Sequence, residues 1–231
     1  MSDNAAVAVL IPTLNEAESI GGLLAILSTM GFSEIVVADG GSADDTVAIV
    51  RSFPAVTYVE SQRGRGKQLR AATAASSAPV LFFLHADTVP PVHAVSCIRR
   101  ALQSPEVVGG CFRLRFDERS WLLDLSAWLT RFETPLTTFG DQGFFVRRRT
   151  LQILGGVPDQ LFLEDVELRA RLVRAGGFIK LSENVLTSAR RYKSLGVIVG
   201  QLRNALIVAG YYVGLSPEKL SRFYPPQKPV A

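Results

Sequence analysis

Three short apolar runs in the first part of the chain each end abruptly in polar residues. The runs are Val7–Ile11, Ile35–Ala38 and Val80–Leu84. Continuous apolar runs of this length are typical of strands that are buried on both faces of a parallel sheet. The pattern therefore predicts three such strands, each of which delivers polar side chains at its carboxyl end.

Helical patterns separate these runs. The predicted helices cover residues 17–30, 46–52, 66–76 and 92–102, with a further short strand at 57–60. We expect Asp44 or Asp45 to cap the second of these helices. Regular alternation of strand and helix predicts an α/β fold of the Rossmann-like kind, with parallel strands joined by right-handed crossovers.

The pattern changes after Val108. Residues 110–116 alternate in a way that predicts an edge or antiparallel strand, and strands are also expected at 144–146 and 184–187. A helix is predicted from Asp165 to Ala175, ended by Gly176. An apolar stripe at helical spacing, of the kind that is usually core, is formed by Trp121, Leu125, Trp128, Leu129 and Phe132. We therefore expect the second half to extend the sheet in mixed orientation.

Polar residues from the three strand ends are predicted to meet at one edge of the sheet. They are Thr13, Asn15, Glu16, Asp39 and Asp87. Ligands of open α/β sheets bind beyond the carboxyl ends of the strands, so these side chains form a candidate site. Carboxylate oxygens suit hard divalent cations, which makes Asp87 a candidate metal ligand.

Composition and charge narrow the class of partner. The chain has 231 residues, 48% of them hydrophobic, with a net charge of +4 and a pI near 9.3. This is enough apolar material for one continuous domain. The basic residues are scattered, without a concentrated face or a recognisable nucleic-acid-binding motif, so we expect no nucleic-acid partner. Anionic substrates or a membrane surface suit the mild positive charge better.

Cysteine usage and the amino terminus suggest a reducing compartment. Cys97 and Cys111 are the two cysteines, and they lack the CxxC spacing of a zinc or redox site. The first residues do not combine a positively charged segment with an apolar core, as a secretory signal would. We expect a cytoplasmic protein, with a peripheral position at the inner face of the membrane as an alternative.

A basic, glycine-rich turn at residues 63–67 resembles a phosphate loop only superficially. The first glycine of GxxxxGK is absent, and Gln68 follows the lysine where that loop has serine or threonine. Even so, Arg63, Arg65 and Lys67 precede a predicted helix, whose amino terminus could help them to hold a diphosphate. A solvated basic turn explains the same residues equally well.

Four motifs in register give the chain a family resemblance. They are Ile11-Pro-Thr-Leu-Asn-Glu16, Val37-Ala-Asp-Gly-Gly-Ser42, Phe83-Leu-His-Ala-Asp87 and residues 163–172, which include Glu164-Asp165. Together they resemble a family 2 glycosyltransferase with the GT-A fold. A closer set resembles a bacterial subgroup associated with arsenosugar biosynthesis, and it comprises residues 63–68, 85–88, 140–143 and 188–192.

The resemblance implies an inverting transfer from a nucleotide-sugar donor with a divalent metal, Mg²⁺ or Mn²⁺. A uridine diphosphate sugar is the expected donor, and the acceptor is an unidentified hydroxyl, which in some members belongs to a lipid carrier. The implied donor-binding residues are Pro12, Thr13, Asn15, Glu16, Asp39, Gly40, Arg63, Arg65, Lys67, Gln68 and His85. Asp87 matches the last acid of the DxD metal motif, whose first acid is His85 in this chain.

The same resemblance assigns the acid–base residues. Asp165 would take the proton of the acceptor hydroxyl, with Glu164 beside it, although two acids at a helix start also serve as simple caps. Four further residues are expected near the donor sugar, the diphosphate or the acceptor, and they are Asp141, Gln142, Arg190 and Arg191. A turn would account for the first two of these residues, and a surface cationic pair for the last two.

We expect three parts within one GT-A domain of residues 1–231. Residues 1–108 form the donor half, 109–192 the acceptor and catalytic half, and 193–231 a helical tail. The tail segment 194–215 is apolar, but Arg203 lies at its centre, where an arginine costs roughly 2.5–3.5 kcal/mol on membrane insertion. We therefore expect this segment to pack on the domain, to pair with a second subunit or to lie in a membrane interface.

Two other functions are compatible with these features. A sugar nucleotidyltransferase also combines a parallel sheet, carboxylates and magnesium, but it would carry a glycine-rich basic signature near its amino terminus, where this chain has Pro12-Thr-Leu-Asn-Glu16. The rival from another class is a catalytically silent scaffold that binds the donor or a membrane. The intact Glu164-Asp165 pair and Asp87 favour the transferase over that scaffold.

Overall fold

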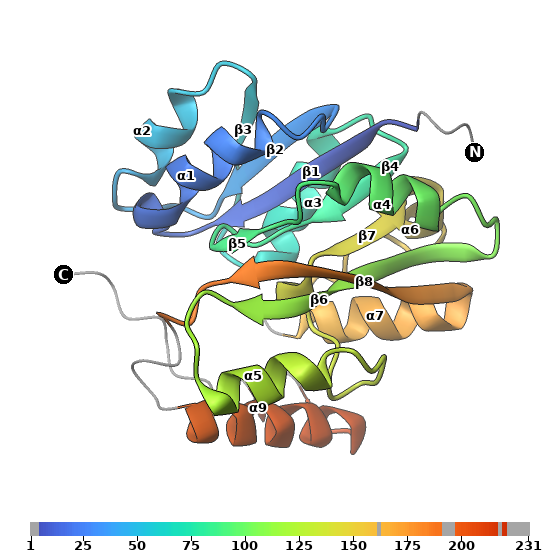
Figure 1. The fold of residues 1–231 in the computed structure, drawn as a ribbon. Coiled ribbons are helices and arrows are strands. Elements are labelled where there is room, and N and C mark those ends of the chain that lie inside the picture. Colours follow the sequence, from blue (N-terminus) through green and yellow to red (C-terminus); the bar gives the residue numbers. More distant parts are fainter. Residues whose placement is uncertain (1–4, 161–162, 191–196, 217–218, 221–231) are drawn as a thin grey trace.

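The computed structural model describes residues 5–160, 163–190, 197–216 and 219–220. Within them, an eight-stranded sheet has the order β3-β2-β1-β4-β7-β6-β8-β5, with helices on both faces (Figure 1). The predicted α/β class and the change from a parallel to a mixed sheet are both confirmed.

The first half of the chain supplies the parallel part of the sheet. Its elements are β1 (Val7–Thr13), α1 (Ala17–Leu27), β2 (Glu34–Asp39), α2 (Thr46–Arg51), β3 (Val56–Glu60), α3 (Arg65–Ala75) and β4 (Val80–Phe83). Successive residues of β1 face opposite sides, so Val9 shares a buried cluster with Leu24 of α1, and Leu10 shares another with Leu69 of α3. Burial on both faces explains the unbroken apolar runs.

The second half adds the mixed part of the sheet. Its elements are β5 (Thr88–Val89), α4 (Ala94–Ala101), β6 (Val107–Phe116), α5 (Trp121–Leu129), the 3-10 turn η1 (Gly140–Gln142), β7 (Phe144–Arg147), α6 (Arg148–Ile153), α7 (Glu164–Ala175), β8 (Gly177–Thr187) and α9 (Val197–Tyr212). The clusters place α1 and α4 on one face of the sheet and α3, α6 and α7 on the other.

The prediction for residues 110–116 is half right. Strand β6 pairs antiparallel with β7, as expected, but it also pairs parallel with β8 and therefore lies inside the sheet rather than at its edge. Strand β8 starts at Gly177, well before the predicted 184. The sequence did not predict this first part because it is only half-buried and shows no clear alternation. The two-residue strand β5 is the true edge on this side.

The apolar stripe on α5 was predicted to be core, and this prediction is wrong. Trp121 is 73% exposed, Leu125 48% and Trp128 46%, and only Leu123 of this helix is buried. Helical spacing shows that side chains share a face, but it does not show what that face contacts. Leu123 packs into the core cluster on the α1 and α4 side of the sheet, which turns the stripe outward.

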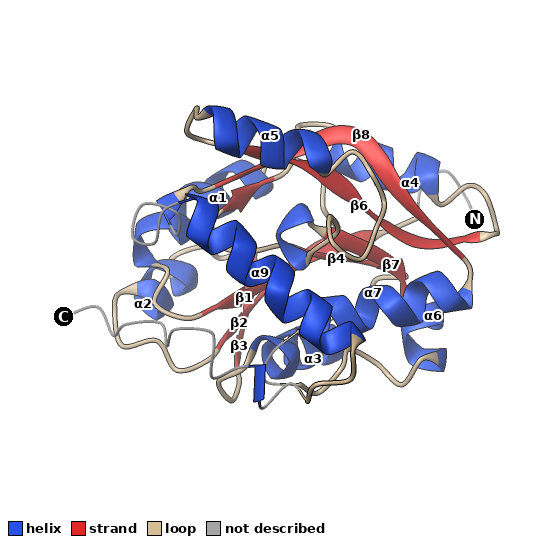
Figure 2. Ribbon diagram, turned by 90° about the horizontal axis from the view of Figure 1, so that it is seen from below, coloured by secondary structure: helices blue, strands red, loops and turns tan. Residues whose placement is uncertain are grey.

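Helix α9 packs against the start of α7. Ile207 and Val208 form a small buried cluster with Leu163, Val166 and Leu220. Figure 2 shows α9 from below, lying across the underside of the molecule. Among the described residues, no helix is both long enough and apolar enough to cross a membrane.

A close approach at the start of α3 gives a test of the fold. A Cβ atom on Gly66 would lie 2.4 Å from the carbonyl oxygen of Pro158, whereas a Cβ on Gly22 in α1 would meet no atom within 4 Å. Gly66→Ala should therefore lower the free energy of unfolding by about 1–3 kcal/mol, measured by urea denaturation. The matched Gly22→Ala should be neutral or stabilising, by up to about 1 kcal/mol. Equal effects of the two substitutions would contradict this packing.

Candidate active site

The carboxyl ends of β1, β2 and β4 form one edge of the sheet, as predicted. Thr13 pairs in register with Asp39 across β1 and β2, and Leu10 pairs with Phe83 of β4. The loops that follow these strands carry the predicted residues up to Asp87. The sheet therefore brings together the polar strand ends that were far apart in sequence.

Asp39 is almost fully buried and organises the loop after β2. Its carboxylate accepts hydrogen bonds from Thr13 Oγ1 at 3.1 Å, Gly41 N at 2.9 Å, and Ser42 N and Oγ at 2.8 and 2.5 Å. These donors satisfy both carboxylate oxygens from within the protein. Asp39 thus fixes the loop after β2 at this edge of the sheet, and Ser42 is a supporting residue that sequence reasoning did not single out.

Two further side chains join the loops after β1 and β2. Asn15, at a φ of 55°, accepts a hydrogen bond from Ala43 N through its side-chain oxygen, and its own backbone N–H donates to Ser42 Oγ. Both distances are 2.8 Å. Asp44 accepts from Ala17 N at 3.1 Å and from Thr46 N at 3.0 Å, so its carboxylate satisfies the first backbone N–H of both α1 and α2. Of the two predicted caps, Asp45 occupies the N-cap position of α2 but makes no side-chain cap hydrogen bond, and Asp44 supplies the hydrogen bond to Thr46 N.

Gln68 links the ends of β1 and β2 through hydrogen bonds to their backbone. Its Nε2 donates to Thr13 O at 2.6 Å and Ala38 O at 3.1 Å, and the side chain is buried. A Cβ on Gly40 would approach the Gln68 amide to 3.0 Å, so a glycine fits there. The described contacts of Gln68 thus hold β1 and β2 together, which is a supporting role for a residue predicted to bind the donor.

The three basic residues of the 63–67 turn behave differently. Arg63 is exposed, and Lys67 donates to Gln62 Oε1 at 2.8 Å. Arg65, the first residue of α3, instead points inward: its Nε lies 2.9 Å from Glu164 Oε1 and its Nη1 lies 3.2 Å from His85 Nε2. Only Arg65 of the three reaches the pocket described next.

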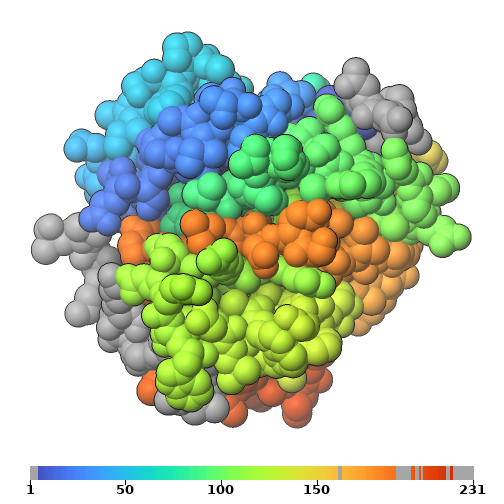
Figure 3. Space-filling view, in the orientation of Figure 1, coloured from blue at the N-terminus to red at the C-terminus, as the bar shows by residue number. Residues whose placement is uncertain are grey.

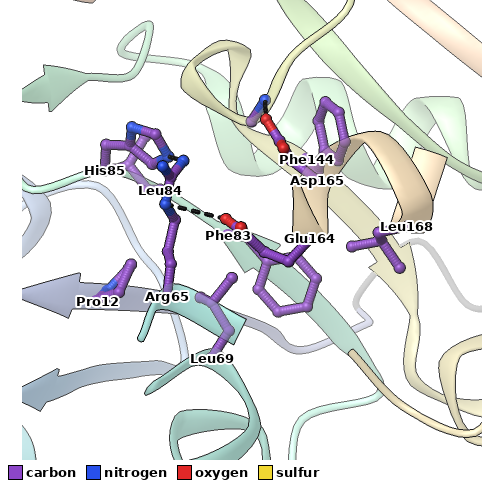
Figure 4. Close-up of a pocket in the computed structure, with 11 residues that line it drawn as sticks. Pro12, Arg65, Leu69, Phe83, Leu84, His85, Phe144, Glu164, Asp165 and Leu168 are labelled. Carbon is purple, nitrogen blue, oxygen red and sulfur yellow. Dashed lines mark hydrogen bonds and ion pairs between the residues drawn. The ribbon is translucent and has the colours of Figure 1, made fainter. Parts of the chain in front are cut away.

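A pocket of about 320 Å³, including space open to solvent, lies between the two halves of the chain. Figure 4 shows Arg65 between His85 and Glu164, with Asp165 nearby. The pocket is lined by Pro12, Arg65, Leu69, Phe83, Leu84, His85, Gly140, Phe144, Glu164, Asp165 and Leu168. A guanidinium only donates hydrogen bonds, so Arg65 Nη1 is the donor and His85 Nε2 the acceptor in this contact.

Glu164 and Asp165 begin α7 after a left-handed residue, Leu163, whose φ is 63°. A left-handed leucine is strained, and such strain is common at functional sites. Glu164 is 3% exposed. Burial raises the pKa of Glu164 to about 7, although the attraction of Arg65 lowers it and the charge of Asp165 raises it further.

Asp165 is held by backbone donors. Its Oδ2 accepts from Gly140 N at 2.8 Å, and its Oδ1 accepts from Val166 N at 2.9 Å. A Cβ on Gly140 would lie 3.0 Å from the Asp165 Cβ, so this approach favours a glycine. The carboxylate is thus fixed in orientation while it remains at the wall of the pocket.

The 3-10 turn before β7 contains Asp141 and Gln142. Gln142 is fully buried, donates from Nε2 to Thr137 O at 2.7 Å and accepts from Cys111 Sγ at 3.6 Å. These contacts position the turn that delivers Gly140 to Asp165. Asp141 lies in the same turn and is partly buried.

Arg190 contacts three carboxylates of the segments that follow β1 and β4. Its Nη2 lies 2.9 Å from Glu16 Oε2 and 3.7 Å from Asp87 Oδ2, and its Nη1 lies 3.3 Å from Glu18 Oε2. Burial alone would lower the pKa of Arg190, but Glu16 and the other two carboxylates outweigh it and raise the pKa. The neighbouring Arg191 lies outside the described residues.

The carboxylates at this edge could hold a divalent metal only together with oxygen atoms of a bound ligand. Within the described ranges, no group of three or more His, Cys, Asp and Glu residues could hold a metal ion. The side chain of Asp87 is 25% exposed at the sheet edge, so its carboxylate is open to a cation. Mg²⁺ often binds through one or two carboxylates plus substrate phosphates, and the residues present fit that arrangement.

These features define a class of protein: an α/β fold with carboxylates at the ends of parallel strands and the pair Glu164 and Asp165 at the adjoining pocket. The sequence profile described as Glycosyl transferase family 2 matches residues 8–153, which is more than half of the chain. The chain belongs to this family.

Curated relatives agree in name. Glycosyltransferase AglJ of Haloferax volcanii is 36% identical over 83 residues, which cover 36% of this chain and 27% of the relative. The probable glycosyltransferase YdaM of Bacillus subtilis is 27% identical over 211 residues, which cover 78% of this chain and 50% of the relative. The chain therefore spans at most about half the length of these relatives.

Solved structures share the fold. TarS of S. aureus, residues 1–349, has a TM-score of 0.66 at 14% identity and covers 94% of this chain and 69% of that one. Glucosyl-3-phosphoglycerate synthase of Mycobacterium tuberculosis, in complex with Mn²⁺ and UDP, has a TM-score of 0.65 at 18% identity and covers 92% and 81%. At these identities the likeness shows the GT-A glycosyltransferase fold alone.

The raised pKa of Glu164 gives a test of its burial. The pKa of Glu164 in the folded protein lies above the ordinary glutamate value of 4.5. The contribution of Glu164 to stability is therefore greatest below pH 4.5 and declines as the pH rises toward 7. Glu164→Gln should therefore stabilise the protein more at pH 8 than at pH 5, by on the order of 2–3 kcal/mol, measured by chemical denaturation at both pH values.

The matched control is Glu167→Gln on the same helix. Glu167 has a lowered pKa because hydrogen bonds from Tyr211 and Arg171 outweigh its desolvation. Its contribution is present above pH 4.5 and is lost in acid, so this variant should be less stable than the wild type near neutrality, with the gap closing in acid. If both variants showed the same pH trend, the burial of Glu164 described here would be wrong.

Proposed function

We propose that this chain is an inverting, metal-dependent glycosyltransferase that moves a sugar from a nucleotide-sugar donor to a hydroxyl acceptor. The observation that carries the proposal is the convergence of Arg65, Glu164 and Asp165 on one pocket beside the strand ends, in a chain of glycosyltransferase family 2. This family membership favours the transferase over a sugar nucleotidyltransferase and over a silent scaffold.

A uridine diphosphate sugar is the proposed donor. The M. tuberculosis synthase that shares this fold has been solved with UDP-glucose and Mn²⁺, and TarS has been solved with UDP. In our chain, the loop braced by Asp39 and Asn15 would contact the nucleoside, and Pro12 lines the adjoining pocket. Calorimetric titration with UDP, GDP and dTDP, with and without Mn²⁺, tests this choice.

The diphosphate would lie between two cationic regions. Arg65 and Lys67 stand at the amino terminus of α3, where exposed amides also favour an anion, and Arg190 stands across the edge beside Asp87. Guanidinium groups bind phosphate oxygens in pairs of hydrogen bonds. Arg190 is bound to carboxylates in the described structure, so donor binding would require it to exchange partners.

Asp87 would hold the divalent metal together with diphosphate oxygens. A metal bound there supplies charge neutralisation for the departing nucleoside diphosphate. His85 would support the site indirectly, because its Nε2 already faces Arg65.

Asp165 would act as general base on the acceptor side. Its carboxylate is oriented by Gly140 N and Val166 N, and it would take the proton of the acceptor hydroxyl as the oxygen attacks the anomeric carbon opposite the leaving group. Glu164 would act as a positioning residue that fixes Arg65 through their ion pair. Asp141 and Gln142 would shape the sugar and acceptor side of the pocket.

The subgroup and the acceptor are also part of the proposal. The segments 63–68, 85–88, 140–143 and 188–192 support placement in the subgroup associated with arsenosugar biosynthesis. The subgroup association does not specify the acceptor hydroxyl, which a screen of candidate acceptors would identify. The donor half is proposed at 1–108 and the catalytic half at 109–192.

Removal of the base should separate chemistry from binding. Asp165→Asn keeps an oxygen that can accept from Gly140 N but cannot take a proton, so the rate of sugar transfer should fall by about 10²–10⁴-fold. Affinity for UDP, measured by calorimetry, should change less than about threefold, on the premise that the base contacts the acceptor.

The control for this experiment is Asp159→Asn, which changes an exposed carboxylate shortly before α7. It should leave both transfer and UDP affinity unchanged. Loss of UDP affinity in parallel with activity in Asp165→Asn would argue for a donor-binding role, and full activity would remove the residue from the chemistry.

The metal role of Asp87 predicts a different signature. Asp87→Ala should abolish the increase in UDP affinity that Mn²⁺ produces in the wild-type protein, because one of the few oxygen ligands is lost. The measurement is UDP titration with and without Mn²⁺. Asp45→Ala, which removes an exposed carboxylate that makes no cap hydrogen bond, should retain the Mn²⁺ effect. An undiminished Mn²⁺ effect in Asp87→Ala would rule out this ligand.

A further inference from the structure

The guanidinium of Arg190 lies between carboxylates from two distant parts of the sequence. Its Nη2 is 2.9 Å from Glu16 Oε2 and 3.7 Å from Asp87 Oδ2. Its Nη1 is 3.3 Å from Glu18 Oε2. Two carboxylates thus face the same nitrogen atom, so one positive charge serves both of them at the edge where a divalent metal is proposed to bind.

The backbone holds Arg190 next to Asp87. Thr88 and Thr187 pair across β5 and β8, and their hydroxyl oxygens are 2.8 Å apart. One residue further on, Ser188 N donates to Asp87 O at 3.1 Å, and Ser188 Oγ accepts from Arg190 N at 3.3 Å. Figure 3 shows the orange atoms of β8 against the green atoms of the segment that contains β5. The approach of Arg190 to Asp87 is therefore built into the fold.

The head of the Arg190 side chain is less firmly held than its backbone. The side chain is 42% exposed, whereas Ala189 is buried and its N–H donates to Asp117 Oδ1 at 2.8 Å. Ion pairs with this exposure are weak, because water solvates both partners and salt screens their attraction. A ligand that offers better acceptors can therefore draw the guanidinium away while the backbone stays in place.

A divalent cation at this edge needs the oxygen atoms that Arg190 contacts. Mg²⁺ and Mn²⁺ take hard oxygen ligands, and Asp87 is the carboxylate proposed to supply one of them. Arginine stays charged in proteins, and two cations on one carboxylate repel each other. With Arg190 in place, a metal would bind Asp87 against this repulsion and with few protein ligands.

We propose that Arg190 is a tethered counter-ion that keeps the metal out of the ligand-free site and leaves Asp87 when a nucleoside diphosphate binds. Guanidinium groups bind phosphate oxygens in pairs of hydrogen bonds. Diphosphate oxygens also complete the coordination of a metal that has few protein ligands. The metal therefore binds together with the donor and not before it. This role of Arg190 rests on the proposed function, in which Asp87 holds the metal.

The exchange of partners makes metal and nucleotide binding cooperative. A diphosphate removes Arg190 from Asp87, and a metal on Asp87 releases Arg190 for the diphosphate. By thermodynamic linkage, the factor by which UDP strengthens Mn²⁺ binding equals the factor by which Mn²⁺ strengthens UDP binding. Part of this factor comes from the displacement of Arg190, so the factor should be smaller in a variant that lacks the arginine.

Arg190→Gln tests this role with two ligands that are measured separately. Without UDP, the variant should bind Mn²⁺ about five- to tenfold more tightly than the wild type, because the competing cation is gone. Without Mn²⁺, it should bind UDP about tenfold more weakly, because a guanidinium contact to the diphosphate is lost. Electron paramagnetic resonance measures free Mn²⁺, and calorimetry measures UDP binding. General damage to the fold would weaken both.

Arg149→Gln is the matched control for the loss of one positive charge. Arg149 is exposed on α6, which begins at the opposite edge of the sheet, because Arg147 pairs with Val80 at the start of β4. Both affinities of this variant should equal those of the wild type. The double variant Arg190→Gln/Asp87→Ala should lose the gained Mn²⁺ affinity, which locates the gain at Asp87.

Unchanged or weaker Mn²⁺ binding by Arg190→Gln without UDP would overturn this role of Arg190, as would a gain that persists in the double variant. The proposed function stands in either case if Mn²⁺ strengthens UDP binding in the wild type and Asp87→Ala abolishes that effect. A wild-type UDP affinity that is independent of Mn²⁺ would instead overturn the metal role of Asp87, and the role of Arg190 with it. The two failures therefore give different patterns of binding.

Discussion

The ion pair between Arg65 and Glu164 joins the two halves of this molecule at the pocket. Arg65 starts the helix that follows the third parallel strand, and Glu164 starts the helix that follows the long loop after α6. A buried carboxylate is expensive to ionise, and a single nearby cation offsets part of that penalty. The ion pair therefore connects the basic turn near the proposed diphosphate position to the start of α7. Asp165 is the next residue on that helix.

Supporting contacts divide the predicted site into two kinds of residue. Asp39, Asn15 and Gln68 direct their polar groups into the loops and strand ends, where they shape the edge of the sheet. Asp87 and Asp165 stay partly accessible and can meet a ligand. This division has a simple physical origin, because a site can be rigid only if the polar groups behind it are satisfied within the protein.

Helix α9 connects the start of α7, which carries the proposed catalytic residues, with the surface of the molecule. Helix α9 packs its buried side against the start of α7 and turns apolar side chains outward.

The sequence by itself determined the parallel strands, the helices between them and the edge at which polar residues gather, because apolar runs and caps are local signals. It also indicated Glu164-Asp165 as a pair at a helix start. Only the tertiary structure decided that Arg65 reaches Glu164, that Gln68 braces two strands, and that β6 lies inside the sheet. It also turned the α5 stripe outward, since periodicity defines a face while long-range packing chooses what that face contacts.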